Sequence, residues 1–287
     1  MKSQTVPQIL GAHTLTLVPP LGGSPAQVAS ARNDQTRAQH EALLREAQRL
    51  RGAIYAADGA IKLTPGMPEY VDPLDRLSWH VVMRDSRMKV CGALRVTFHE
   101  VNCTVSDLAI SSCPLFCDAE WHDRGWAILS KFLHRASELG VRVVEAGGWA
   151  LEGSLRAGRK GALLVLSGWA LTRVLGGAMI IGLLTSRHGA SRMMRFLGGR
   201  EFSDECGPVP AYFDERYGCD MELIQFHSYR VNPIFEGVVQ DLSNIFERDL
   251  ASACAKPPLS PAISESDIAS LGPMVSQLEV ALQPTGS

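Results

Sequence analysis

The order of helix-like and strand-like segments predicts a mixed α/β (α+β) fold, in which a twisted, mostly antiparallel sheet carries helices on both faces. Two observations support this prediction. Segments with helical spacing of apolar residues alternate along the chain with short runs of β-branched residues. In addition, the polar turn Arg84–Arg87 joins two such runs, which is typical of an antiparallel hairpin.

The elements follow one another between residues 39 and 248. Apolar residues at helical spacing, with polar residues between them, identify the helices, and Gly140 and Gly198-Gly199 end two of them. The expected helices are Gln39–Ile54, Trp126–Leu139, 161–175, 189–197 and Pro233–Arg248. The expected strands are Ser78–Met83, Lys89–Phe98, Val141–Glu145, Ala178–Thr185 and Met221–Phe226.

The two ends of the chain have a different composition from the middle. Both are rich in Pro, Ser and Ala, the first also in Gly, and neither shows a sustained period. We therefore expect flexible segments at 1–35 and 253–287, and one folded domain over 36–252.

Composition excludes several classes of protein. With 28 basic and 30 acidic residues, the chain has no basic excess that would indicate nucleic-acid binding. Seven irregularly spaced cysteines and the lack of an apolar leader favour a cytoplasmic protein with free thiols. Cys113, Cys117 and His122 could begin a metal cluster, but no second pair completes four ligands, so we expect no metal site.

The segment 161–184 is apolar enough to suggest a membrane span, since Arg173 is its single charge. However, Gly176-Gly177 divides it into a helix-like part and a short β-branched run. This pattern favours a buried helix followed by a buried strand, and it leaves membrane association as the alternative.

An acidic loop precedes the hairpin. Glu69, Asp72 and Asp75 lie within seven residues, and Arg95 follows near the end of the second strand. Three carboxylates can bind an ammonium group or order an arginine. A solvated acidic loop is the alternative.

Two further residue types indicate acid–base chemistry. Glu145 ends an expected strand and is suited to act as a general base for an amine, although pairing with an arginine is an equal alternative. Tyr212 or Tyr217, before the last strand, could protonate a leaving thiolate. A packing role for both tyrosines is the alternative.

A glycine- and arginine-rich turn leads into the apolar helix. Arg156, Arg159, Gly161 and Ala162 stand where exposed backbone N–H groups and positive charge could hold a phosphate. An ordinary helix start is the alternative. The turn is not a P-loop, because it lacks the GK[ST] ending, and the chain has no GxGxxG, GxSxG or HExxH motif.

Taken in order, these motifs resemble the GNAT superfamily, and specifically its long-chain N-acyl amino acid synthases, which are similar to acyl-homoserine-lactone synthases. The resemblance covers residues from about 45 to 228. It rests on Arg51-x-x-x-Tyr55, the acidic loop, SWHVVMRD with VCGALRV, Glu145, RAGRKGALL, GLLTSRHGASRMMRFLGGREF and VPAYFDERYGCDMELIQF.

The resemblance implies a GNAT-like splayed sheet whose gap admits the pantetheine arm of an acyl thioester. Acyl carrier protein or coenzyme A would be the donor, an amino acid α-amine the acceptor, and no cofactor would be tightly bound. Arg51, Asp72, Asp75, Arg95 and Trp149 would shape the acceptor site, and Ala150, with the turn at 156–162, the donor site. Arg159 departs from the family turn, which has glycine at that position.

Three functions remain open at this stage: an N-acyltransferase that makes N-acyl amino acids, a homoserine-lactone-type synthase that uses S-adenosylmethionine, and a GNAT-like protein that binds acyl carriers or lipids without turnover. Glu145 and the phosphate-type turn favour an enzyme. If the function is acyl transfer, the apolar segment 161–184 would line a tunnel for a long acyl chain, since each buried methylene contributes about 0.8 kcal/mol.

Overall fold

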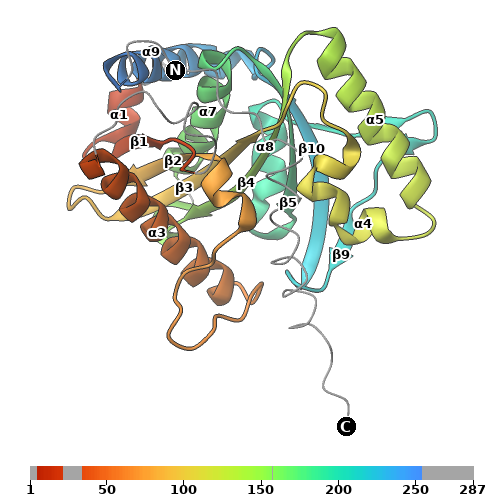
Figure 1. Ribbon diagram of the computed structural model, residues 1–287, viewed down its shortest axis with the longest axis horizontal. Helices are drawn as coiled ribbons and strands as arrows, with labels where there is room; N and C mark the ends of the chain where they lie inside the picture. Colours follow the sequence, from red (N-terminus) through yellow and green to blue (C-terminus); the bar gives the residue numbers. More distant parts are fainter. Residues whose placement is uncertain (1–4, 22–33, 157, 254–287) are drawn as a thin grey trace.

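The computed structural model describes residues 5–21, 34–156 and 158–253. Within these residues one sheet has the strand order β1-β2-β3-β4-β5-β10-β6, and β9 pairs with β10 (Figure 1). Its strands are β1 (Thr14–Val18), β2 (Trp79–Arg84), β3 (Val90–Phe98), β4 (Arg142–Leu151), β5 (Ala178–Thr185), β6 (Arg200–Glu201), β9 (Tyr212–Asp214) and β10 (Cys219–His227). A small hairpin pairs β7 (Ser203–Asp204) with β8 (Gly207–Pro208).

The sheet is mostly antiparallel, as predicted, and β4 and β5 form its one parallel pair among the described strands. The helices are α1 (Val6–Leu10), α3 (Asp34–Ala57), α4 (Pro114–Cys117), α5 (His122–Glu138), α6 (Gly153–Arg156), α7 (Arg159–Val174), α8 (Ala190–Leu197) and α9 (Glu236–Ala253). Short 3₁₀ turns lie at Pro73–Leu77, Val105–Asp107, Ala109–Ser112, Arg187–Gly189 and Pro233–Phe235.

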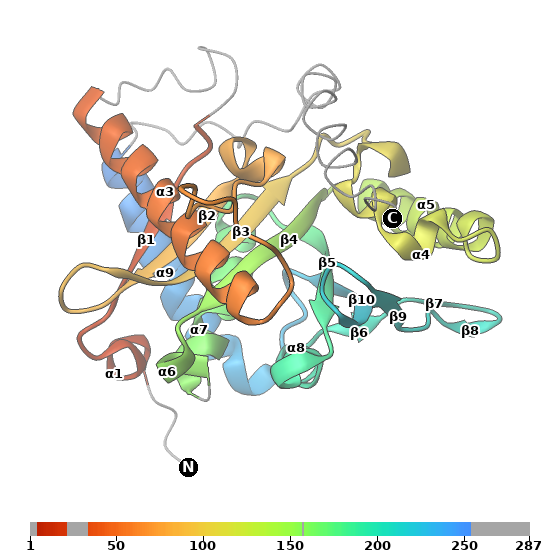
Figure 2. The ribbon, with the colours of Figure 1, turned by 90° about the horizontal axis from the view of Figure 1, so that it is seen from below.

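Helices cover both faces of the sheet, as predicted. Successive strand residues point to opposite faces. Ala93 of β3 packs with Ala47 of α3, whereas Leu94 packs with the residues of α7. Ile181 of β5 likewise packs with Phe132 of α5. Helix α7 therefore covers one face, while α3 and α5 lie at opposite ends of the other (Figure 2).

The apolar segment 161–184 forms a buried helix and a buried strand. Helix α7 is buried around almost its whole circumference, since it packs against the sheet on one side and α9 on the other. Strand β5 follows after the Gly176-Gly177 turn with the bounds predicted from the sequence. Among the described residues, no helix is long and apolar enough to cross a membrane.

The first 35 residues contain more structure than expected. Residues 6–10 form α1, and β1 pairs with β2 along its whole length, from Thr14 opposite Arg84 to Val18 opposite His80. The residues Thr14–Val18 alternate as in a strand, but they lie between Pro- and Gly-rich stretches that favour a loop. The rest of the expected flexible segments, 1–4, 22–33 and 254–287, lies outside the described residues.

The parallel pair β4–β5 is split. Its register runs from Arg142 opposite Ala178 to Glu145 opposite Ile181 and then stops, although both strands continue. At the apex the backbones are close, because a Cβ on Gly182 would lie 3.0 Å from the carbonyl oxygen of Ala146. Beyond this point the β5-facing edge of β4 has no strand partner in the described chain. The sheet therefore has a V-shaped gap between two of its central strands.

Candidate functional site

A buried ion pair lies between α3 and the sheet. The guanidinium of Arg51 donates from Nη1 to Asp75 Oδ1 over 2.9 Å and from Nη2 to Asp75 Oδ2. Gln48 Nε2 and the backbone N–H of Asp72 also donate to this carboxylate, each at 2.9 Å. Burial alone would raise the pKa of Asp75, but Arg51 and then Arg95 outweigh it and lower the pKa to about 2. Asp75 is thus ionised and fully engaged.

The loop before the hairpin holds these carboxylates in place. Asp72 caps the 3₁₀ turn Pro73–Leu77 by accepting from the N–H of Leu74 over 2.9 Å, and Pro73 occupies the first position of the turn. The buried His80 bonds the carbonyl oxygen of Asp75 through Nε2 at 2.7 Å. Burial lowers the pKa of His80 to about 4, so this neutral imidazole donates the hydrogen bond.

Arg95 joins the same cluster from β3. Its Nη1 forms an ion pair with Asp72 and lies 3.5 Å from Asp75 Oδ1. The residue is 9% exposed, yet its Nε–H has no hydrogen-bond acceptor in the described chain. Two guanidiniums and two carboxylates thus neutralise one another, while Arg95 retains a buried donor that a ligand could use.

The glycine pair on β4 makes room for both arginines. The β3–β4 register slips between Ala93 and Arg95, because β4 holds an extra residue at this bulge. Gly148 adopts a left-handed φ of 60°, and a Cβ there would lie 2.8 Å from Arg51 Nη1. A Cβ on Gly147 would lie 3.2 Å from Arg95 Nη2. The bulge therefore brings the split edge of β4 directly against the charged cluster.

Trp149 and Ala150 follow on the same edge. Ala150 is buried opposite Ala93, and Trp149 packs partly against the α7 side of the core. The indole N–H of Trp149 is buried without an acceptor in the described residues. Trp149, expected at the acceptor site, and Ala150, expected at the donor site, therefore both lie on the part of β4 that has no β5 partner.

Three tyrosines border the cluster. The rings of Tyr70 and Tyr55 meet edge to face at 5.6 Å, and those of Tyr55 and Tyr217 at 6.3 Å. Arg51 lies over the Tyr70 ring at 5.3 Å and donates to the Tyr70 carbonyl oxygen at 2.7 Å. Burial raises the pKa of Tyr217, so its hydroxyl keeps its proton at neutral pH.

Glu145 lies at the apex of the split, with several hydrogen-bond partners. Its Oε2 accepts from the N–H of Ala109 at 2.9 Å and bonds His99 Nε2 at 2.8 Å, while Oε1 accepts from the N–H of Ile110 at 2.8 Å. Burial alone would raise the pKa of Glu145, but these partners outweigh it and lower the pKa. A carboxylate has about four lone-pair sites, so one remains for a further proton donor.

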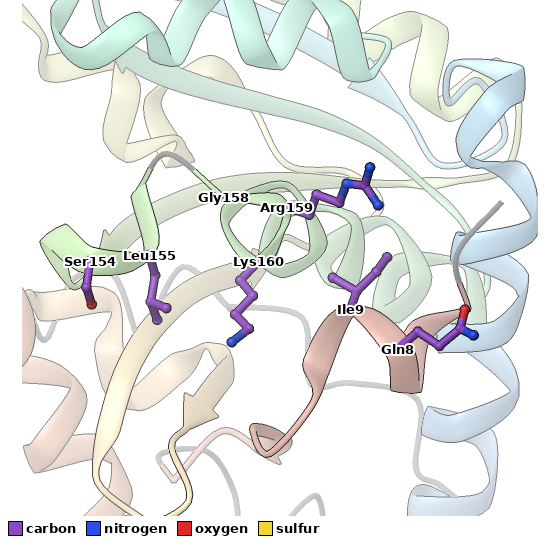
Figure 3. A pocket seen from close by; sticks show the side chains of 7 residues that line it. All are labelled: Gln8, Ile9, Ser154, Leu155, Gly158, Arg159 and Lys160. Carbon is purple, nitrogen blue, oxygen red and sulfur yellow. The ribbon is translucent and has the colours of Figure 1, made fainter. Parts of the chain in front are cut away.

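The arginine-rich turn is divided between two places. Arg156 bonds Leu151 O at 3.3 Å and forms an ion pair with Asp58 at 3.3 Å. Arg159 and Lys160 begin α7 and point away from each other beside an open hollow of ≈ 320 Å³ (Figure 3). Ala162 is partly buried against the core. A Cβ on Gly161 would lie 3.1 Å from Leu151 Cδ2, so this glycine allows close helix–strand packing.

Two residues of the site were not predicted from the sequence. Gln48 lies in α3, and Asp58 follows this helix directly. The helical spacing of apolar residues does not distinguish such polar residues from ordinary surface residues. Gln48 lies on a buried turn of α3 at 6% exposure, and a buried glutamine in an amphipathic helix is a signal that could have been used. Within the described residues, no group of three His, Cys, Asp or Glu side chains could hold a metal ion.

No family model matches the sequence, and no curated protein sequence is similar to it. Several solved structures share the general course of the backbone. The AHL synthase LasI is 12% identical with a TM-score of 0.48, covering 78% of this chain and 95% of LasI. BjaI, a CoA-dependent acyl-homoserine lactone synthase solved with SAM and isopentyl-CoA, is 12% identical with a TM-score of 0.48, covering 91% and 99%.

FeeM, an N-acyl amino acid synthase from uncultured soil microbes, is 9% identical with a TM-score of 0.45, covering 75% of this chain and 91% of FeeM. Both groups of enzymes that the sequence resembles are thus among the structures found. These likenesses concern the arrangement of helices and strands. The activity of this chain is therefore inferred from its own residues.

Proposed function

We propose that the protein is a cytoplasmic N-acyltransferase that moves an acyl group, long-chain by resemblance, from a carrier thioester to the α-amine of an amino acid. The observation that carries the proposal is the junction of two features. The unpaired edge of β4 begins at the same bulge, Gly147-Gly148, that packs against Arg95 and Arg51. A donor in the split would therefore lie beside an acceptor in the charged cluster.

The split suits a pantetheine arm. Such an arm carries two amide groups, and the free edge of β4 offers backbone N–H and C=O groups at strand spacing. A backbone N–H near Trp149 or Ala150 could hold the oxyanion that forms when the thioester is attacked. The turn with Arg156, Arg159, Gly161 and Ala162 lies at the end of β4, where it could hold the donor phosphate.

The charged cluster suits a zwitterionic acceptor. The unpartnered Nε–H of Arg95 can donate to a carboxylate, and Asp72, one-quarter exposed, can accept from an ammonium group. Arg51 and Asp75 already neutralise each other. The pair of Arg95 and Asp72 is therefore the one whose partners a bound amino acid could replace. Glu145 would take the amine proton, directly or through water, and Tyr217 would return a proton to the thiolate.

The proposal is tested by incubating the purified protein with acyl thioesters of several chain lengths, carried by acyl carrier protein or by coenzyme A. The acceptors are a mixture of amino acids in one arm and S-adenosylmethionine in another. Mass spectrometry should detect an N-acyl amino acid in the first arm. Formation of an acyl-homoserine lactone in the second arm only would show that the acceptor is S-adenosylmethionine and not an amino acid. If folded protein forms no product in any arm, enzymatic acyl transfer is overturned.

A further inference from the structure

Three connecting segments meet at the open end of the β4–β5 split. One follows α3, one follows β4 and includes α6, and one joins β5 to α8, and the three lie at the same edge of the molecule (Figure 2). Asp58, from the first segment, contacts Arg156 of the second and His188 of the third. The side chain of Asp58, directly after α3, thus bridges the two sides of the gap.

Arg187 strengthens this bridge through the backbone. Its Nη1 donates to the carbonyl oxygen of Asp58, and its Nη2 donates to the carbonyl oxygen of Gly218 over 2.8 Å. Gly218 follows Tyr217 in the turn before β10. The end of α3, the β5–α8 connection and the β9–β10 turn are therefore tied together by one guanidinium at the mouth of the split.

The carboxylate of Asp58 is held loosely. Arg156 Nη1 and Nη2 lie 3.4 and 3.3 Å from its two oxygens. Charged hydrogen bonds are usually about 2.7–2.9 Å long. A second Asp–Arg pair of nearly the same exposure is much tighter, since Arg124 Nε lies 2.6 Å from Asp204 Oδ2. The contact between Asp58 and Arg156 is therefore one that a better anion can displace.

His188 adds an unusual backbone conformation. Its φ is 57°, in the left-handed region that residues other than glycine seldom adopt. Its Nε2 lies 3.2 Å from Arg156 Nη1 and 3.3 Å from Asp58 Oδ1. One ring nitrogen cannot accept from the arginine and donate to the aspartate at once. The cluster thus contains a residue in a rarely adopted backbone conformation, and its ring nitrogen can form only one of these two hydrogen bonds.

We propose that Arg156 and His188 form the binding site for the phosphate of the donor's pantetheine arm, with Arg187 adding charge, and that Asp58 occupies this site until the phosphate displaces it. This inference rests on the proposed function. Arg156 contacts the Asp58 carboxylate and Arg187 the Asp58 backbone carbonyl oxygen, so two guanidiniums accompany one carboxylate and the site has a net positive charge when Asp58 occupies it. A phosphate offers more charge and more acceptor oxygens than a carboxylate.

The experiment measures the binding of two probes by calorimetry: 4′-phosphopantetheine and pantetheine, which differ only in the phosphate. The variants are Asp58→Asn and Arg156→Gln, with Asp204→Asn as a matched control remote from the split. We expect Asp58→Asn to tighten binding of phosphopantetheine roughly two- to fivefold, as for loss of a partly exposed competing charge, and to leave pantetheine unchanged. Arg156→Gln should abolish the preference for phosphopantetheine, and Asp204→Asn should change neither affinity.

The outcomes separate this inference from the proposed function. Equal affinity for both probes, or an equal gain for both in Asp58→Asn, would overturn the phosphate site and leave the donor in the split. Binding of neither probe by any folded variant would overturn both proposals. Repeating the comparison with coenzyme A and with a phosphopantetheinylated carrier protein tells the two sources of the phosphate apart, since Asp58→Asn should improve the one that uses this site.

Discussion

Gly148 and Arg51 lie so close that a Cβ on the glycine would be 2.8 Å from the arginine Nη1. This contact joins the bulge on β4 to the buried ion pair beneath α3. It sets the unpaired edge of β4 against the charged cluster, and it makes Gly148 an informative position for mutation.

Replacing Gly148 with alanine should disturb the proposed acceptor site. Two effects add, namely the left-handed φ of 60° and the collision with Arg51. Gly140→Ala is the matched control, because that residue has a φ of 64° and open space around it. We expect both variants to lose about 1 kcal/mol of stability or more, and only Gly148→Ala to raise the acceptor KM. Equal kinetics in the two variants would show that the contact with Arg51 is irrelevant.

Replacing Asp75 with asparagine should destabilise the fold by about 3 kcal/mol at neutral pH, because Arg51 would be left buried without its counter-ion. The measurement is denaturant unfolding. A second change, Arg51→Met, should recover part of the loss in the double variant, since it removes the unpaired charge. If the double variant is no more stable than Asp75→Asn, the cost does not come from the buried charge.

The same carboxylate should make stability depend on acid pH. The pKa of Asp75 is lowered to about 2 in the folded protein, against about 3.9 in an unfolded chain. Its contribution is therefore present above about pH 4 and is lost as the pH falls through about 2. The stability difference between the wild type and Asp75→Asn should shrink by on the order of 2 kcal/mol over this window. A constant difference from pH 5 to pH 2 would contradict the assignment.

Glu145→Gln should lower turnover more at neutral pH than at high pH, because the acceptor amine loses its proton unaided as the pH rises. A general base typically contributes about 10²–10⁴ in rate. Asp107→Asn is the control: Asp107 Oδ2 accepts from the N–H of Thr104 at 2.6 Å and steadies the segment that Glu145 also holds. An equal loss at all pH values, shared by Asp107→Asn, would leave Glu145 a structural role only.

Tyr217→Phe should slow thiolate release while keeping the ring contact with Tyr55. Burial raises the pKa of Tyr217, so the hydroxyl remains a proton donor over the whole neutral range. We expect kcat to fall about 100-fold with little change in the KM for either substrate. Tyr229→Phe, at an exposed tyrosine, should have no effect. Unchanged kcat in Tyr217→Phe would assign that tyrosine to packing.

Long periodic segments were predictable from the sequence. Strand β5 has the predicted bounds, and α5 begins four residues before the expected Trp126. The prediction failed where contacts between distant parts of the chain determine the secondary structure. Strand β4 runs on to Leu151, because the Gly147-Gly148 pair, expected to follow the strand, forms a bulge inside it. Edge strand β1 exists because β2 offers it a partner.

The site was predictable only in part, for the same reason. Arg51, Asp72, Asp75 and Arg95 were expected to act together, and they form one cluster. The partner of Arg156 was not predictable, because Asp58 lies 98 residues away in the chain and no local pattern links the two. Pairings of this kind depend on how α3 packs against the sheet, which periodicity does not determine.

The most direct test of the central claim is the stoichiometry of a single reaction. The purified protein is mixed with an acyl thioester, with and without an amino acid acceptor, and free thiol and N-acyl product are measured together over time. Thiol release should depend on the acceptor, should give one thiol for each amide formed, and should fall sharply in Arg95→Gln. Acceptor-independent thiol release, or thiol release without amide, would contradict the claim.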